Sequence, residues 1–309
     1  MTSPRDDGVS IHMSATAPRT DRPAPPPVID LDGMPVHAVT EAECVARILA
    51  ALDAGRGGYV VTPNLDHLRR FHRDAEYRRL AASADLTVAD GVPLLWAAKL
   101  AGTPLPGRVA GSDLIDSLSA AAARAGRSLY LLGGETGCAD EAAGVLTGRY
   151  PGLRIAGTHC PAVGFESDPA AMSAIADRLA AARPDVVYVA LGSPKQERLI
   201  AALRDRLPGA WWLGVGISFS FVAGRVARAP VWMQRTGLEW LHRLTREPRR
   251  LAKRYLVEGL PFAAGLAVRC LLRRLRVLRP ARSAAPAAPA SGPCPTGATA
   301  SADRVFGSH

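Results

Sequence analysis

A chain of 309 residues, 48% of them hydrophobic, can bury a substantial core, so disorder throughout is excluded and one α/β domain with appendages is the simplest organisation. Its five scattered cysteines lack a Cys-x-x-Cys spacing, which argues against a disulfide framework or a zinc site and indicates a reducing compartment. The net charge of +10 comes from residues 224–282, where 15 Lys and Arg residues accompany three Asp and Glu residues. Such a basic region could bind nucleic acid, an anionic membrane face or a phosphate-bearing substrate, and charge alone does not choose among them.

The chain begins with a polar, proline-rich stretch. Residues 1–27 show no periodicity, so we expect a disordered leader. Because this stretch has no apolar core of a signal peptide, we expect a protein that stays in the cytoplasm.

Helix starts are marked at three places. Thr40-Glu41-Ala42-Glu43 has the spacing of a capping box, and Asp168-Pro169 forms an N-cap and N1 pair for a helix to Ala182. Ser112 or Asp113 can cap a helix that starts at Leu114.

Six apolar runs alternate with helical segments over residues 28–224. This alternation predicts an α/β fold: a Rossmann-like, mostly parallel sheet with helices on both faces. The runs are GYVV from Gly58, LTVA from Leu86, SLYLL from Ser128, LRIAG from Leu153, DVVYVA from Asp185 and WWLGV from Trp211.

Polar residues or glycines directly follow five of these runs. They are Thr62-Pro63-Asn64, Asp90-Gly91, Gly133-Gly134, Gly192-Ser193-Pro194 and Gly216. In open α/β sheets ligands bind outside the carboxyl ends of the strands, so we expect these five junctions to converge on one crevice. That crevice is the candidate active site.

Asp90 is the candidate general base. It follows an apolar strand and precedes a glycine, which places its carboxylate at the mouth of the crevice. A helix N-cap explains the residue about as well.

Gly133 and Gly134 lie between a strand and a helix, where bare backbone N–H groups favour a phosphate. A plain strand-to-helix turn explains them equally often. The full Gly-x-Gly-x-x-Gly and an acidic ribose partner are missing, which disfavours a dehydrogenase and leaves a nucleotide possible.

The segment after the fifth run is a further candidate for substrate contacts. Gly192, Pro194, Lys195, Gln196 and Glu197 lie there, although an ordinary solvated first helical turn has the same composition. The chain's isolated histidines have no metal-ligand spacing, so we interpret them as surface or hydrogen-bonded residues and predict no metal site. They are His37, His67, His72, His159 and His242.

The loop GTPLPGRVAGSDL places Arg108 on an exposed turn and is long enough to fold over the crevice. Residues 225–282 form a basic helical appendage, in which two amphipathic helices break at Pro248. The run GLPFAAGLAV has only ten apolar residues, too few to span a bilayer, so an interfacial segment on an anionic membrane is expected. Residues 283–309 are expected to be a disordered tail.

The motifs taken together resemble the WecG/TagA/CpsF family of bacterial glycosyltransferases over roughly residues 36–256. The motifs are TPNLDHL, ADGVPLLW, RVAGSDL, LYLLGGETG, YPGLRI, DVVYVALGSPKQE, GVGISFSFVAG, RAP and LEWLHRLTREPRR. The resemblance implies an inverting, metal-independent transferase. It would move N-acetylmannosamine or a related sugar from UDP to a sugar on an undecaprenyl-diphosphate lipid at the cytoplasmic membrane face, with no cofactor beyond the UDP-sugar donor.

The resemblance also implies roles for individual residues. Asp90 matches the catalytic base, Thr62 and Asn64 match the polar pair beside it, and Gln196 matches a donor contact. The family's arginines that close over the nucleotide diphosphate match Arg243 and Arg250, with Lys253 or Arg254 completing the group. Two positions depart from the usual pattern, Gly107 and Ser220.

Two other functions stay open at this stage. The first is a non-catalytic nucleotide- or lipid-binding protein that keeps the fold. The second, nucleic-acid binding, is disfavoured because no aromatic stacking platform accompanies the basic tail. A homo-oligomer is possible.

Overall fold

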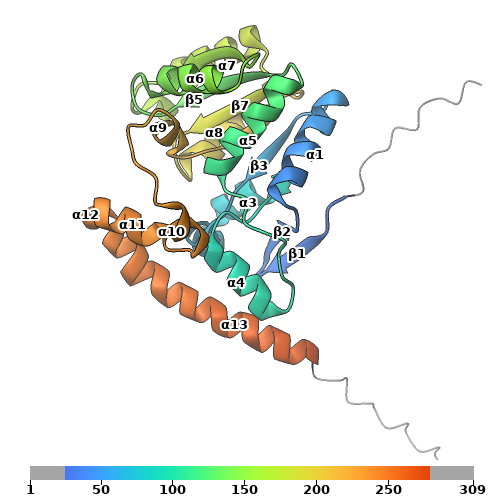
Figure 1. Cartoon of the computed structure of the whole chain (residues 1–309), viewed down its shortest axis with the longest axis vertical. Helices are drawn as coiled ribbons and strands as arrows, with labels where there is room; N and C mark the ends of the chain where they lie inside the picture. The colour runs from blue at the N-terminus through green and yellow to red at the C-terminus, as the bar shows by residue number, and fades with distance from the viewer. Residues whose placement is uncertain (1–24, 279–309) are drawn as a thin grey trace, which may run out of the picture.

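The computed structural model describes residues 25–278 and contains one six-stranded sheet, all of whose strands are parallel (Figure 1). The strand order is β4-β3-β8-β7-β5-β6. The strands are β3 (Gly58–Val61), β4 (Leu86–Thr87), β5 (Ser128–Gly133), β6 (Arg154–His159), β7 (Val186–Ala190) and β8 (Trp211–Gly214). All six predicted strands are present, and the predicted fold class is confirmed.

The sheet buries both of its faces, because successive side chains on each strand point in opposite directions. On β7, Tyr188 packs with one core and Val187 and Val189 pack with another. The first core is completed by α1 (Glu41–Asp53), α5 (Gly111–Arg124), α6 (Cys138–Arg149) and α9 (Ser218–Val222), and the second by α7 (Pro169–Ala182) and α8 (Lys195–Leu203). Helices therefore cover both faces, as predicted.

Two of the predicted helix starts are confirmed and one is wrong. Thr40 forms a capping box with Glu43, and the Asp168 side chain accepts a hydrogen bond from the Ala170 N–H. The helix expected from Leu114 begins at Gly111 without a side-chain cap. Asp113 does not cap this helix because it lies within the first turn, after the N-cap Ala110; two arginines bind its carboxylate, as described below.

A two-stranded antiparallel hairpin precedes the first helix and was not predicted. It consists of β1 (Val28–Leu31) and β2 (Met34–His37), joined by Asp32 and Gly33. Both turn residues have positive φ, at 54° and 87°. An Asp-Gly pair between apolar runs is a strong hairpin signal, so this element could have been found in the sequence.

A third hydrophobic cluster lies beside the sheet and fastens the C-terminal part to the body. It joins the hairpin and the helices α2 (Leu65–Arg73), α3 (Ala75–Ala82) and α4 (Val92–Ala101) to Leu266 and Cys270 of the last helix. In Figure 1 that helix runs beneath α4 along the lower edge of the molecule.

The appendage contains α10 (Val231–Arg235), α11 (Glu239–Arg246), α12 (Pro248–Ala252), a π-helical segment η3 (Lys253–Gly259) and α13 (Leu260–Leu278). The predicted break before Pro248 is confirmed. Beyond it, however, the helix continues without interruption to residue 278.

The ten-residue apolar run lies within a longer helix, so its length does not exclude a membrane-crossing helix, contrary to the expectation from the sequence. Among the described residues, the stretch Lys253–Leu275 is long and apolar enough to cross a membrane by length and composition. Glu258 and Arg269, the charges that bound the apolar run in the sequence, are both paired with the body of the protein. Glu258 lies 2.7 Å from Arg69, and Arg269 lies 2.8 Å from Asp32.

Candidate active site

A cavity of about 940 Å³ lies at the carboxyl ends of the strands. It is within the range typical of ligand pockets. All five predicted strand ends contribute to its wall, through Thr62, Asn64, Asp90, Gly91, Gly134, Gly192, Ser193, Pro194 and Gly216. The predicted convergence on one crevice is therefore present.

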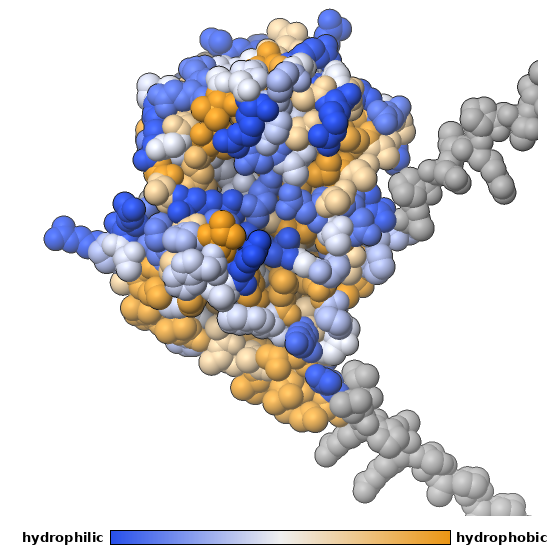
Figure 2. Space-filling model, viewed as in Figure 1, coloured by the Kyte–Doolittle hydropathy of each residue, from blue (hydrophilic) through white to orange (hydrophobic). Residues whose placement is uncertain are grey.

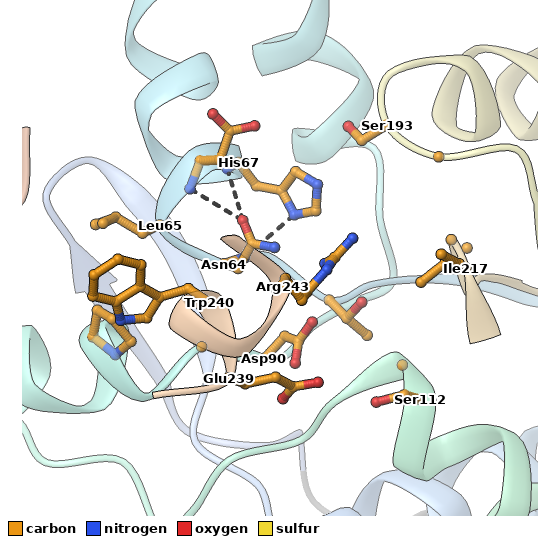
Figure 3. Close-up of a pocket in the computed structure, with 18 of the residues that line it drawn as sticks. Asn64, Leu65, His67, Asp90, Ser112, Ser193, Ile217, Glu239, Trp240 and Arg243 are labelled. Atoms are coloured by element: carbon orange, nitrogen blue, oxygen red, sulfur yellow. Dashed lines mark hydrogen bonds between the residues drawn. The ribbon is translucent and has the colours of Figure 1, made fainter. Parts of the chain in front are cut away.

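Asp90 follows strand β4, and its side chain lines this cavity (Figure 3). Its side chain is 29% exposed, so protein surrounds most of the carboxylate. Burial raises the pKa of Asp90 to about 7, although Arg108 at 4.0 Å opposes the shift. The N-cap of α4 is Gly91, with no side-chain cap bond, so the alternative of Asp90 as a helix cap is not supported.

Four charged side chains form a closed ring next to Asp90. Arg108 lies 2.6 Å from Asp113 and 3.4 Å from Glu239, while Arg228 lies 2.5 Å from Asp113 and 3.7 Å from Glu239. Two arginines thus balance two carboxylates, and Asp90 is the fifth, unbalanced charge. Glu239 and Asp113 raise the pKa of Asp90 and Arg108 and Arg228 lower it, so burial is the main cause of the raised pKa.

Thr62 and Asn64 lie at the end of the neighbouring strand β3. Thr62 is only 8% exposed. The Asn64 side-chain oxygen accepts hydrogen bonds from the N–H groups of Asp66 and His67 and so caps α2 (Figure 3). This cap leaves the amide nitrogen of Asn64 to donate to a bound molecule.

Gln196 is fixed between two strand ends. Its Oε1 accepts a hydrogen bond from the Gly216 N–H at 3.1 Å, and its Nε2 donates to Glu197 at 3.1 Å. A Cβ on Gly214 would lie 2.4 Å from the Gln196 amide, so a larger residue there would displace this side chain from its hydrogen bonds. Glu197 is 2% exposed and lies behind Gln196 rather than on the cavity wall.

The cations that line the cavity differ in how much of their charge is already neutralised. Lys195 pairs with Glu166, and Arg254 lies 2.6 Å from Asp66. Arg108 belongs to the ring. Within the part of the chain that the structure describes, Arg243 of α11 has no ion pair, and its charge is available to an anion (Figure 3).

Comparison with known proteins agrees with this geometry. Residues 29–276 match the model of the family described as "Glycosyl transferase WecG/TagA/CpsF family". The chain belongs to the WecG/TagA/CpsF family. It is therefore a glycosyltransferase, and its family places it in cell-wall polysaccharide synthesis.

Two curated relatives carry the same name. A Bacillus spizizenii protein is 35% identical and a Bacillus subtilis protein 31% identical over 199 residues, which are 64% of this chain and 75% of each relative. Both are named N-acetylglucosaminyldiphosphoundecaprenol N-acetyl-beta-D-mannosaminyltransferase.

Several predicted contact residues of this WecG/TagA/CpsF glycosyltransferase are not on the cavity wall. Lys253 is exposed and points away, so Arg254 is the member of that pair at the site. Gly133 packs against β7, where a Cβ would lie 2.7 Å from the Ala190 carbonyl oxygen, and only Gly134 faces the cavity. The side chain of Arg250 lies outside the described part of the structure.

The prediction that Arg108 lies on an exposed turn is wrong. Its side chain is only 19% exposed, because its ion pairs hold it in the ring. Ser220 lines the cavity and contacts Cys138, whereas a Cβ on Gly107 would meet nothing within 4 Å. The prediction of hydrogen-bonded histidines is confirmed for His37 and His67, because each accepts a hydrogen bond from a backbone N–H.

Three members of the ion ring were missed as site residues in the sequence. Asp113, Arg228 and Glu239 come from three separate segments, and no local pattern links them. The prediction of no metal site also took the chain to lack an Asp-x-Asp motif, and this is wrong, because Asp30 and Asp32 form one. This pair lies in the hairpin, bound by Arg273 and Arg269, and is not part of the cavity wall. Among residues 25–278, no group of three or more His, Cys, Asp or Glu side chains could hold a metal ion.

Proposed function

We propose that this protein transfers N-acetylmannosamine, or a related sugar, from UDP to N-acetylglucosamine on an undecaprenyl-diphosphate lipid, with inversion and without a metal ion. The names of the two relatives support the sugar and the acceptor. The observation that carries the chemistry is that one cavity holds both the Asp90 carboxyl, with a pKa of about 7, and the guanidinium of Arg243, which has no ion pair among the described residues 25–278.

Asp90 acts on the acceptor. Its carboxylate takes the proton of the acceptor hydroxyl as that oxygen bonds to the anomeric carbon of the donor. A base works best when its pKa lies near the working pH, and burial brings the pKa of Asp90 to that range. Attack from the face opposite the leaving group inverts the anomeric configuration.

Arg243 acts on the leaving group. As the bond between the anomeric carbon and the diphosphate oxygen breaks, the electron pair goes to UDP, and a cation near that oxygen stabilises the charge. Arg243 makes charge-assisted hydrogen bonds to the diphosphate, and Arg254 supplies further positive charge once it turns from Asp66. These arginines take the place that a metal ion holds in other transferases.

The surface of the last helix supports a position of the site next to a membrane. Its outer row of apolar side chains is about half exposed, at 57% for Val268, 49% for Leu272 and 50% for Leu275. Figure 2 shows this apolar surface along the lower edge of the molecule. We propose that α13 lies on the cytoplasmic face of the membrane, with Leu266 and Cys270 still packed on the body.

A panel of UDP-sugars tests the function. Purified protein is incubated with each donor and a short-chain lipid-diphosphate N-acetylglucosamine, and UDP release is followed with and without EDTA. We expect release with UDP-N-acetylmannosamine or a related donor, unchanged by EDTA. Loss of activity in EDTA and its return with Mg²⁺ would contradict metal independence. Donor binding without release from any donor would favour the non-catalytic binding protein.

A further inference from the structure

The cavity does not end at the polar strand ends but continues between α4 and the last helix. This second part is lined by apolar and small side chains. Trp96, Ala97 and Leu100 come from α4, and Leu260, Ala263 and Ala267 come from α13. We call this part the apolar arm, and it is not needed to hold a sugar or a diphosphate.

The two helices make the arm a continuous path away from Asp90. Helix α4 begins next to Asp90, and its C-terminal Gly102 lies beside the last helix, where a Cβ would be 3.7 Å from the Arg274 side chain. The α4 residues that line the cavity recur every four positions, at Val92, Trp96 and Leu100, so they share one helix face. Eight residues at 1.5 Å each give an arm of about 12 Å.

The arm has a buried floor and an exposed apolar rim. On the floor, Leu266 and Ala97 are 2% and 3% exposed. At the rim, Trp96, Leu100 and Leu260 are 55%, 38% and 52% exposed, although all three line the cavity. Large apolar side chains gathered around one opening mark a binding site for an apolar group.

Only one of the two substrates has an apolar part to place there. A nucleotide sugar is polar along its whole length, whereas a lipid-linked acceptor carries its sugar, diphosphate and prenyl chain in a row. When that sugar reaches Asp90, its diphosphate must follow it along the same cavity, and the prenyl chain must continue beyond the diphosphate. The small residues Gly259, Ala263 and Ala267 leave room for a branched chain on the α13 side.

We propose that the apolar arm between α4 and α13 binds the first isoprene units of the acceptor and delivers the rest of the chain to the membrane at its rim. This assignment rests on the proposed function, since it presupposes a prenyl-diphosphate acceptor. It also explains why α13 is packed on α4 by one face only: the space left between the two helices is the site of the chain.

Chain length in the acceptor tests the assignment without a membrane. Acceptors with N-acetylglucosamine diphosphate on a methyl group, on one isoprene unit and on three isoprene units are compared below their micelle concentrations. Because burying apolar carbon is favourable, we expect the KM for the acceptor to fall roughly 10- to 100-fold along this series, with little change in kcat.

Two substitutions on adjacent residues of α13 form a matched pair. Ala263→Phe fills the arm, whereas Ala264→Phe adds the same bulk at an exposed position outside the cavity. We expect Ala263→Phe to abolish the dependence of the acceptor KM on chain length, because the added ring occupies the arm. Ala264→Phe should keep the wild-type dependence.

A photoreactive probe gives an independent readout if Ala263→Phe folds poorly. An acceptor with a diazirine on its third isoprene unit should label peptides that contain residues 92–101 or 259–267 of the wild-type protein. Labelling confined to the outer row at Val268, Leu272 and Leu275 would overturn the assignment, and so would a wild-type KM independent of chain length. A wild-type protein that releases UDP with no acceptor at all contradicts the proposed function instead.

Discussion

The two walls of the polar cavity are held in place by different forces. The strand-end wall carries Thr62, directly after β3, and Gln196, in the first turn of α8; they are 8% and 6% exposed and lie at the ends of buried parallel strands. The C-terminal wall carries Glu239, Arg243 and Arg254 on short helices, and ion pairs that are still partly exposed hold it to the body. The base belongs to the first wall and the cation for the leaving group to the second.

This difference separates the two halves of the reaction physically. Partly exposed ion pairs contribute only about 0–1 kcal/mol each and are screened by salt, whereas buried strands are insensitive to it. The position of Asp90 should therefore be robust, and the position of Arg243 should depend on the state of the appendage. Five predictions, made with four substitutions or sets of substitutions, test this division, from the largest expected effect to the smallest.

Asp90→Asn should remove the base and little else. We expect kcat to fall by about 10²- to 10⁴-fold, the usual contribution of a positioned base. Donor affinity, measured by calorimetry with a UDP-sugar, should stay within about twofold. A variant that turns over at the wild-type rate would show that Asp90 takes no proton.

The same substitution should stabilise the protein. The pKa of Asp90 is about 7 in the folded state against 3.8 for an ordinary Asp. As pH rises from about 4 to about 7 the unfolded chain loses this proton first, so the wild type loses stability over that window. Above pH 7, Asp90→Asn should be about 2–4 kcal/mol more stable in urea unfolding, and at pH 4 the gain should vanish. Equal stability at pH 8 would mean that the carboxylate is well solvated.

Arg243→Ala should weaken stabilisation of the leaving diphosphate. We expect kcat/KM to fall about 10- to 100-fold, because a charge-assisted contact to the leaving diphosphate is lost while Arg254 remains. Arg246→Ala is the matched control, since Arg246 is exposed on the same helix and does not line the cavity. Equal losses of kcat/KM in both variants would mean that Arg243 acts only through the general positive charge of the helix and not through contact with the diphosphate.

Acidic substitutions on the outer row of α13 should release the protein from membranes without harming the chemistry. Leu272→Glu with Leu275→Glu should reduce co-sedimentation with anionic vesicles by at least about tenfold, because two exposed leucines that would be buried in lipid are replaced by charges. Thr245→Glu, exposed on α11, is the control. Turnover of a short soluble acceptor should be unchanged. Undiminished pelleting would place the membrane contact elsewhere.

Glu239→Gln should have the smallest effect, a shift in the pH dependence of turnover. Glu239 lies on the C-terminal wall but acts on the pKa of Asp90 on the strand-end wall. In the wild type, kcat/KM should rise with pH and reach half its maximum near pH 7, as Asp90 ionises. Glu239 and Asp113 raise the pKa of Asp90, whereas Arg108 and Arg228 lower it. Removing the Glu239 charge should therefore move the midpoint to lower pH. Glu141→Gln, which breaks a Glu–Arg pair outside the cavity, should leave it in place.

The sequence predicts the strand-end wall far better than the C-terminal wall, for a physical reason. A buried parallel strand is a continuous apolar run, so its end is visible in the sequence and Asp90 and Gln196 could be placed. The ring of Arg108, Asp113, Arg228 and Glu239 depends on contacts between residues up to 131 positions apart, which no local periodicity encodes. The length of the last helix was missed because two charges that interrupt it in the sequence are paired in space.

The most direct test of the account is product analysis with wild-type protein and Asp90→Asn under single-turnover conditions. UDP-N-acetylmannosamine or a related donor is mixed with the three-isoprene acceptor, and the lipid product is identified by mass spectrometry and its anomeric configuration by NMR. The account predicts equal amounts of UDP and a disaccharide lipid of inverted configuration from the wild type, and almost none of either from Asp90→Asn with the donor still bound. Retained configuration, or wild-type yield from Asp90→Asn, would contradict it.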